Sequence, residues 1–146
     1  GMKRIVVRQC QFSGTDTGLR FKSGIGRGGK TEDIFISDIV MNDITDEAIV
    51  FQCDYVDRPA GHDEKKETKA VKLEKVPDFT DIDITRVVCR GTKTAIKAKG
   101  VEGLDCIHDI KISNSTIVYS QKGLDIDENS ARLALDNVQV VKDEMK

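Results

Sequence analysis

Residues 34–41 read IFISDIVM, with apolar side chains at the first, third, sixth and eighth positions. A period of two residues is typical of a strand that buries one of its faces. The same spacing occurs four more times along the chain, with Ser115 as its polar exception. The five copies are Ile5-Val7-Cys10-Phe12, Ile34-Ile36-Ile39-Met41, Ile82-Ile84-Val87-Cys89, Ile110-Ile112-Ser115-Ile117 and Leu133-Leu135-Val138-Val140.

The copies begin at intervals of 29, 48, 28 and 23 residues. The long interval contains residues 57–78, which include six basic residues, six acidic residues and two prolines. We interpret residues 57–78 as a charged surface loop inserted into one repeat, because removing about 20 residues would restore the common interval. We expect the fold not to require this loop, since the entropy of loop closure changes slowly with length.

A second apolar pair follows each of the first four starts by 14 or 15 residues, which gives every repeat at least two short strands. The pairs are Leu19 and Phe21, Ile49 and Phe51, Ile96 and Ala98, and Leu124 and Ile126. Stacked repeats of this length are typical of solenoids.

Two kinds of solenoid fit the period. A leucine-rich repeat would need Asn or Cys in the third apolar slot and a helix after it. That slot varies along this chain, and strand-like sequence follows it. We therefore predict an all-β fold, a right-handed parallel β-helix of about five coils, with residues 1–146 as one domain.

Composition excludes several classes of partner. The 23 basic and 25 acidic residues are interspersed, Trp is absent, and no apolar run is long enough to span a membrane, so neither nucleic acid nor membrane is expected as a partner. No signal-peptide pattern opens the chain. The four cysteines lack C-x-x-C spacing and read as free thiols, so we expect no metal and no cofactor.

Residues 18–23 read GLRFKS, a glycine-rich turn GRGG follows at 26–29, and the repeat at 34–41 comes next. This arrangement resembles the C-terminal portion of glycoside hydrolase family 28, the polygalacturonases, whose R-[IF]-K motif matches residues 20–22. The segments EAIVF at 47–51, VPDF at 76–79 and GTKTAI at 91–96 also resemble bacterial members. The resemblance implies a pectin-lyase-like β-helix that acts on polymers of galacturonic acid outside the cytoplasm.

The resemblance also implies substrate-binding residues. Arg20 and Lys22 stand two apart on one expected strand, so they share a face and could hold a galacturonate carboxylate. Tyr55 matches a tyrosine that contacts substrate in the family. The pattern G-x-G-x-x-G at residues 24–29 is interpreted as a turn, because a strand and not a helix follows it.

The catalytic motifs of the family, N-T-D, D-D and G-H-G, lie before R-[IF]-K, and none occurs in the 19 residues before Arg20. Inverting hydrolysis needs two carboxyl groups, so we expect no catalytic residue and no activity from this chain alone. The alternative is a non-enzymatic β-helix module that binds acidic polysaccharide or a partner chain. A third possibility is an active site rebuilt from Asp16, Asp46 and Glu47.

The sequence of the first coil also predicts an interaction with further coils or with a second copy of the chain. It exposes a strand edge and an apolar cross-section over residues 2–22, so we expect the chain to be the distal part of a longer β-helix. We expect self-association through that coil when the chain stands alone.

Overall fold

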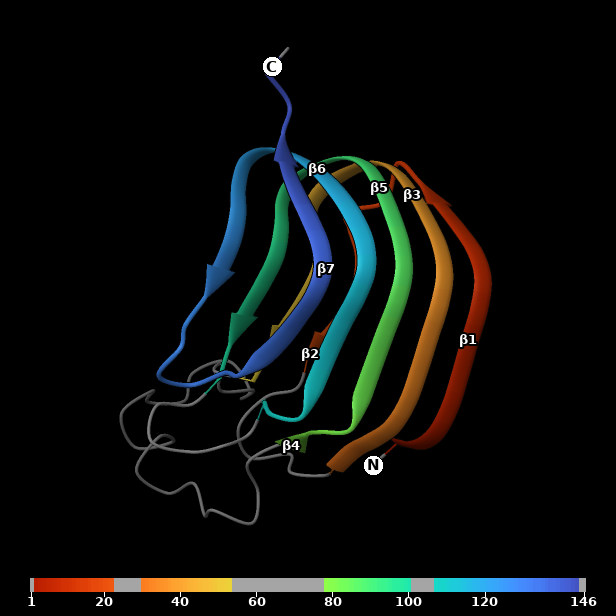
Figure 1. Cartoon of the computed structure of the whole chain (residues 1–146), viewed down its shortest axis with the longest axis vertical. Coiled ribbons are helices and arrows are strands. Elements are labelled where there is room, and N and C mark those ends of the chain that lie inside the picture. The colour runs from red at the N-terminus through yellow and green to blue at the C-terminus, as the bar shows by residue number, and fades with distance from the viewer. Residues whose placement is uncertain (1, 23–29, 54–77, 101–106, 145–146) are drawn as a thin grey trace, which may run out of the picture.

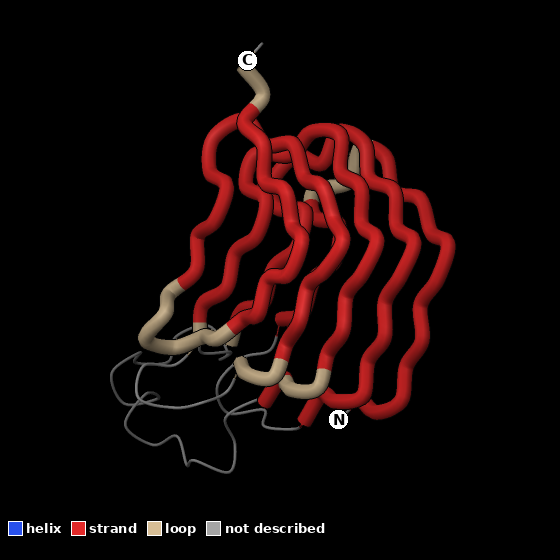
Figure 2. Tube along the Cα trace, viewed as in Figure 1, coloured by secondary structure: helices blue, strands red, loops and turns tan. Residues whose placement is uncertain are grey.

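The computed structural model describes residues 2–22, 30–53, 78–100 and 107–144, which form strands and no helix (Figure 2). The strands are β1 (Met2–Ser13), β2 (Thr17–Lys22), β3 (Lys30–Gln52), β4 (Asp78–Phe79), β5 (Ile82–Lys99), β6 (Ile110–Ile126) and β7 (Leu133–Lys142). In this described part no helix is long and apolar enough to cross a membrane. The predicted insertion at 57–78 lies outside the described residues, apart from Asp78, which begins β4.

All strand pairings are parallel, and the strands follow the order β1-β3-β5-β6-β7, with β2 and β4 paired to β3. Figure 1 shows the long strands lying side by side and bending over one end of the molecule into a second layer. This architecture is a parallel β-helix, as the repeat predicts. The leucine-rich alternative is wrong for the described residues, because no helix follows the strands there.

The register confirms the predicted repeat. Each start pairs with the next, from Ile5 to Ile34, Ile82, Ile110 and Leu133. One slot further, Ile36, Ile84 and Ile112 stack as a buried column. Leu135 continues this column but is 37% exposed, because β7 is the last strand in the order and nothing in the described part stacks on its far side.

The two polar positions in the middle of each repeat contain a corner. The second of them has a positive φ, between 48° and 59°, in all five copies, namely Gln9, Asp38, Arg86, Asn114 and Asn137. A left-handed residue turns the chain and lets the residues on both sides of the corner point inward. Asp and Asn prevail because their short side chains tolerate this conformation best.

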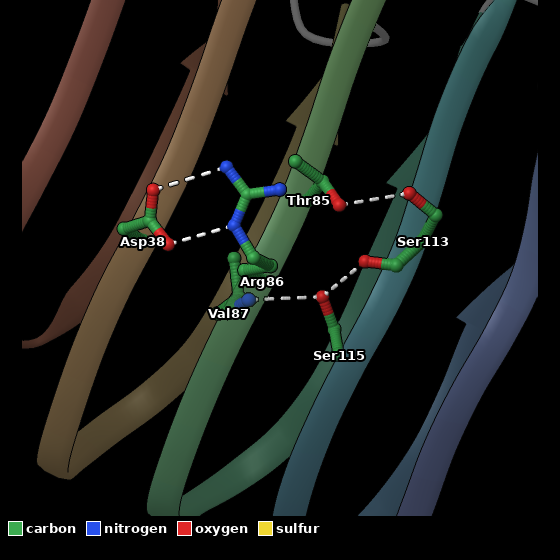
Figure 3. Close-up of polar contacts among 6 residues, drawn as sticks. All are labelled: Asp38, Thr85, Arg86, Val87, Ser113 and Ser115. Carbon is green, nitrogen blue, oxygen red and sulfur yellow. Dashed lines mark hydrogen bonds and ion pairs between the residues drawn. The ribbon is translucent and has the colours of Figure 1, made fainter.

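Side chains stack along these corners from coil to coil (Figure 3). The Arg86 guanidinium donates Nε and Nη2 to the two carboxylate oxygens of Asp38, at 2.7 and 3.1 Å. This hydrogen bond lowers the pKa of Asp38 and raises that of Arg86. Both side chains are solvent-exposed, so the pair orients the corner more than it stabilises the fold.

The polar exception in the repeat, Ser115, has a structural role (Figure 3). Its Oγ accepts a hydrogen bond from the backbone N–H of Val87 at 3.0 Å and donates one to the carbonyl of Ser113 at 2.8 Å. At this position a side-chain hydroxyl of β6 satisfies the N–H of Val87. A buried N–H left without a partner would be destabilising, so an apolar residue at position 115 would remove a needed acceptor from this one place in the stack.

The core lies between the two layers. Phe21 and Phe51 stack with ring centroids 4.6 Å apart, and Phe79 meets both rings edge-on. Cys89 is fully buried beneath the first layer, and burial raises the pKa of its thiol to about 11. Cys10 and Cys89 carry free thiols, as expected, and at neutral pH Cys89 is a protonated core residue.

Candidate functional site

The motif residues 20–22 lie on β2, at the first rung of the second layer. Leu19 points inward, buried, and pairs with Ile49, which continues the inward row to Ile96. Arg20 is exposed on the opposite side of the strand. Gly18 is required here, because a Cβ at this position would lie 2.6 Å from the carbonyl oxygen of Ala48. Because successive residues of a strand point to opposite sides, the buried Leu19 leaves Arg20 pointing outward.

We call the outward side of the second layer the Arg20 face; it comprises β2 and residues 44–52, 92–99 and 119–126. In register, Arg20 is followed by Val50, which is buried, and then by Lys97 and Asp125. Because neighbouring strands lie about 4.8 Å apart, Arg20 and Lys97 stand about 10 Å apart along the coil axis. The face therefore carries basic residues on more than one rung.

Lys22 and Tyr55, the other two predicted binding residues, differ in whether the structure describes them. Lys22 ends β2 and pairs with Gln52, whose neighbour on the next rung is Lys99. Tyr55 lies outside the described residues. Arg20 is thus the one predicted binding residue whose side-chain exposure the structure describes.

The three acidic residues of the rebuilt-site hypothesis lie near one another. The N–H of Asp46 donates to the carbonyl of Asp16 at 2.8 Å, so the two residues stack on adjacent rungs. The register of β3 against β5 shifts between Ile44 and Glu47, as one extra residue is accommodated in β3. Such a bulge re-aims side chains, and as a result the consecutive residues Asp46 and Glu47 both line one groove.

That groove has a volume of about 320 Å³ and lies on the Arg20 face. It is lined by Asp46, Glu47, Lys93, Thr94, Lys97, Gln121, Lys122 and Asp125. A second groove of about 330 Å³ adjoins it and shares Lys93 and Gln121. Both hollows run across β3, β5 and β6, so a ligand lying in them would cross the strands.

The sequence analysis missed the three lysines of the first groove, Lys93, Lys97 and Lys122. A signal for one of them was present, since Lys97 follows its repeat start Ile82 by 15 residues, as Arg20 follows Ile5. Lys93 and Lys122 flank irregularities in the register between β5 and β6. The spacing of the repeat therefore does not predict their positions.

The Arg20 face offers groups that can hold a sugar acid. Guanidinium and ammonium groups hold carboxylates, and carboxylate and amide oxygens accept hydrogen bonds from sugar hydroxyls. A general acid in glycoside hydrolysis needs a desolvated carboxyl, whereas Asp16 and Asp46 are both exposed. Within the described residues, no group of three or more His, Cys, Asp or Glu side chains could hold a metal ion.

Comparison with known proteins identifies a family. The family model described as "Glycosyl hydrolases family 28" matches residues 2–139. A "Probable endopolygalacturonase II" and an "Endopolygalacturonase II", from two strains of Aspergillus niger, are each 32% identical over 88 residues. The alignment covers 59% of this chain and 24% of each relative, so the chain spans about a quarter of the length of these relatives. No solved structure matches.

Proposed function

The chain belongs to glycosyl hydrolases family 28, and from that premise we propose that it is the galacturonan-binding portion of a pectin-degrading glycoside hydrolase. In this proposal the Arg20 face holds galacturonate carboxylates. The observation that carries the proposal is the exposure of Arg20, which follows the buried Leu19 on β2 and so points away from the core.

Arginine suits this role because its planar fork can donate two parallel hydrogen bonds to one carboxylate. By the motif match, Lys22 and Tyr55 are proposed to bind the same substrate. Lys97, which occupies the position of Arg20 two rungs along, supports an anionic ligand over a neutral one. The two similar relatives are named endopolygalacturonases, which supports galacturonan as that ligand.

We propose further that the chain alone does not hydrolyse the polymer. Inverting hydrolysis needs a protonated carboxyl and a second carboxylate that activates water. Among the described residues, Asp16 and Asp46 are solvent-exposed, and the motifs that carry the family's catalytic aspartates are absent from this sequence. Glycosidic cleavage by the isolated chain, measured as new reducing ends from polygalacturonate, would overturn this part of the proposal.

Binding is tested by calorimetric titration with an oligogalacturonate, using the methyl-esterified oligomer as an uncharged ligand of the same sugar. The wild-type chain is expected to bind the acid and not the ester. Arg20→Gln should weaken binding about tenfold or more, because a hydrogen bond to a charged group contributes roughly 1.5–3 kcal/mol. The matched control is Arg90→Gln, an exposed arginine in the first layer. Equal affinity of the wild type and Arg20→Gln would contradict the assignment.

We also propose self-association through residues 2–22. In the described part β1 is the end strand of the sheet, and Ile5, Val7 and Phe12 pack against the core while only partly buried. Sedimentation over a wide range of concentration is expected to show a dimer, and Val7→Lys should weaken it. A monomer at every concentration would exclude this mode of association for the chain.

A further inference from the structure

We propose that β7 of one copy receives β1 of a second copy, so that two chains associate head to tail and form one more parallel strand pair at the contact. This inference rests on the self-association proposed above for residues 2–22, and it names the surface that those residues meet. The partner is a second copy of this chain, and the contact lies on the first layer.

The outer side of β7 is open. The strand pairs with β6 on one side and is the last in the order of the described sheet. Its inward residues Leu133, Val138 and Val140 pack against the core while only partly buried, and Leu135 is 37% exposed. In the described part, β7 therefore offers unpaired backbone groups together with an apolar row, a combination that recruits another strand.

The repeat gives β1 and β7 the same pattern of inward residues. Placing β1 of a second copy beyond β7, in the register that the neighbouring coils already use, brings each apolar slot against the same slot of the other strand. The pairs are Leu133 with Ile5, Leu135 with Val7, Val138 with Cys10 and Val140 with Phe12. The corners coincide as well, because Asn137 and Gln9 have φ values of 55° and 53°.

A two-fold dimer through β7 fits less well. Its two strands would run antiparallel, and matching their apolar slots would set Asn137 of one copy against Asp136 of the other. The two left-handed corners would then miss each other by one residue, and the hydrogen-bond ladder would be interrupted at the bend. The head-to-tail arrangement keeps the strands parallel and the corners aligned.

One row of side chains ends in opposite charges at the two ends of the stack. In register, Arg8 on β1 is followed by Ser37, Thr85 and Ser113, and then by Asp136 on β7. The three hydroxyl residues are buried, whereas Arg8 and Asp136 are exposed and form no ion pair within the described residues. Head-to-tail contact would bring Arg8 and Asp136 onto adjacent rungs, about 4.8 Å apart, and this complementarity favours a second copy as the partner.

The corner of β7 ends a ladder of amides. Asn137 donates Nδ2 to Oδ1 of Asn114 at 2.8 Å, and Gln9 of the second copy would supply the next amide. Arg132 and Arg4 carry like charges, but Arg132 precedes β7, and the register between β6 and β7 begins at Leu133. The paired segment therefore sets no like charges against each other.

The contact is narrow and does not close on itself. In the described part β7 ends at Lys142, so on the second layer residues 119–126 of one copy and β2 of the next would stand two rungs, about 10 Å, apart. Each added copy leaves one β7 and one β1 free. Dimers should therefore grow into longer chains as the concentration rises.

The test uses two variants that each block one end, Val7→Lys on β1 and Leu135→Lys on β7, in sedimentation over a wide range of concentration. Each variant alone should stay monomeric where the wild type associates. An equimolar mixture should form a dimer and nothing larger, because the unblocked ends are β7 of one variant and β1 of the other. Gln139→Lys is the matched control, an exposed outward position on β7 that should associate like the wild type.

Charge reversal tests the same contact at two exposed positions that folding does not depend on. Arg8→Asp and Asp136→Arg should each lower the association constant about three- to tenfold, because an attraction becomes a repulsion. A chain that carries both changes should recover most of the wild-type association, since opposite charges meet again. Circular dichroism of every variant checks that it is folded.

The outcomes separate this inference from the self-association on which it rests. If Val7→Lys weakens association but Leu135→Lys does not, residues 2–22 meet another surface, so the inference is wrong while the proposed self-association stands. A mixture of the two blocked variants that stays monomeric would also overturn the inference. If the wild type is monomeric at every concentration, both proposals fail together.

Discussion

Replacing Ile84 by alanine is expected to lower the free energy of unfolding by about 2–5 kcal/mol, the usual result of a large-to-small change in a core. Ile84 is fully buried and stacks between Ile36 on β3 and Ile112 on β6. Coils of a solenoid bury their apolar faces against one another, so a cavity at Ile84 weakens the column on both sides. Unfolding in urea, followed by circular dichroism, measures the loss.

Val88→Ala provides the control on the same strand, since Val88 points outward and is 37% exposed. Its substitution should change the free energy of unfolding by about 0.5 kcal/mol or less. A loss below about 1 kcal/mol for Ile84→Ala would contradict the register, because a fully buried isoleucine cannot be truncated so cheaply.

Phe51→Ala is expected to have the other large effect, a loss of about 3–5 kcal/mol in the free energy of unfolding. Phe51 is fully buried, stacks on Phe21 at 4.6 Å and meets Phe79 edge-on with centroids 6.5 Å apart. It holds the inner side of β2, whose outer side carries Arg20, so galacturonate affinity should fall together with stability. Urea unfolding and calorimetric titration of the same preparation measure both.

Phe51→Leu is the matched variant, because it keeps an apolar side chain while removing the ring stack. It should lose less stability than Phe51→Ala and keep more of the affinity. If Phe51→Ala unfolds at the wild-type urea concentration, the aromatic cluster does not hold β2 in place and the account of the second layer is wrong.

Much of the fold could be predicted from the sequence because the repeat reflects a strict physical requirement. Inward positions must be apolar on every coil, so Ile34, Ile82 and Ile110 mark paired positions that the structure confirms. The corner at the two polar positions of each repeat was not predicted, and its cause is the left-handed φ of residues such as Asp38 and Asn114.

Two features of the fold could not be predicted from the spacing of residues along the sequence. Ser115 occupies an apolar slot because a backbone N–H on the neighbouring coil needs its hydroxyl, and that need is visible only once the coils are stacked. Leu135 sits in an inward slot yet is exposed, since burial in a solenoid requires a neighbour on both sides. A sequence pattern describes a single coil, whereas these two effects arise from contacts between neighbouring coils.

The candidate site was predicted in part for the same reason. The motif match located Arg20, and the strand period set its direction. The groove beside it depends on the bulge before Glu47 and on the irregular register near Thr92, and neither has a sequence signal as clear as the repeat. Lysines that are far apart in the chain, such as Lys93 and Lys122, therefore come together only in the folded molecule.

The most direct test of the central claim, that the Arg20 face binds galacturonan, is a backbone-amide chemical-shift titration of the ¹⁵N-labelled chain with an oligogalacturonate. The account predicts shifts in Thr17–Lys22 and in residues 92–99 and 119–126, none in β7, and none with the methyl-esterified oligomer. Shifts confined to the first layer, or equal shifts with acid and ester, would contradict it.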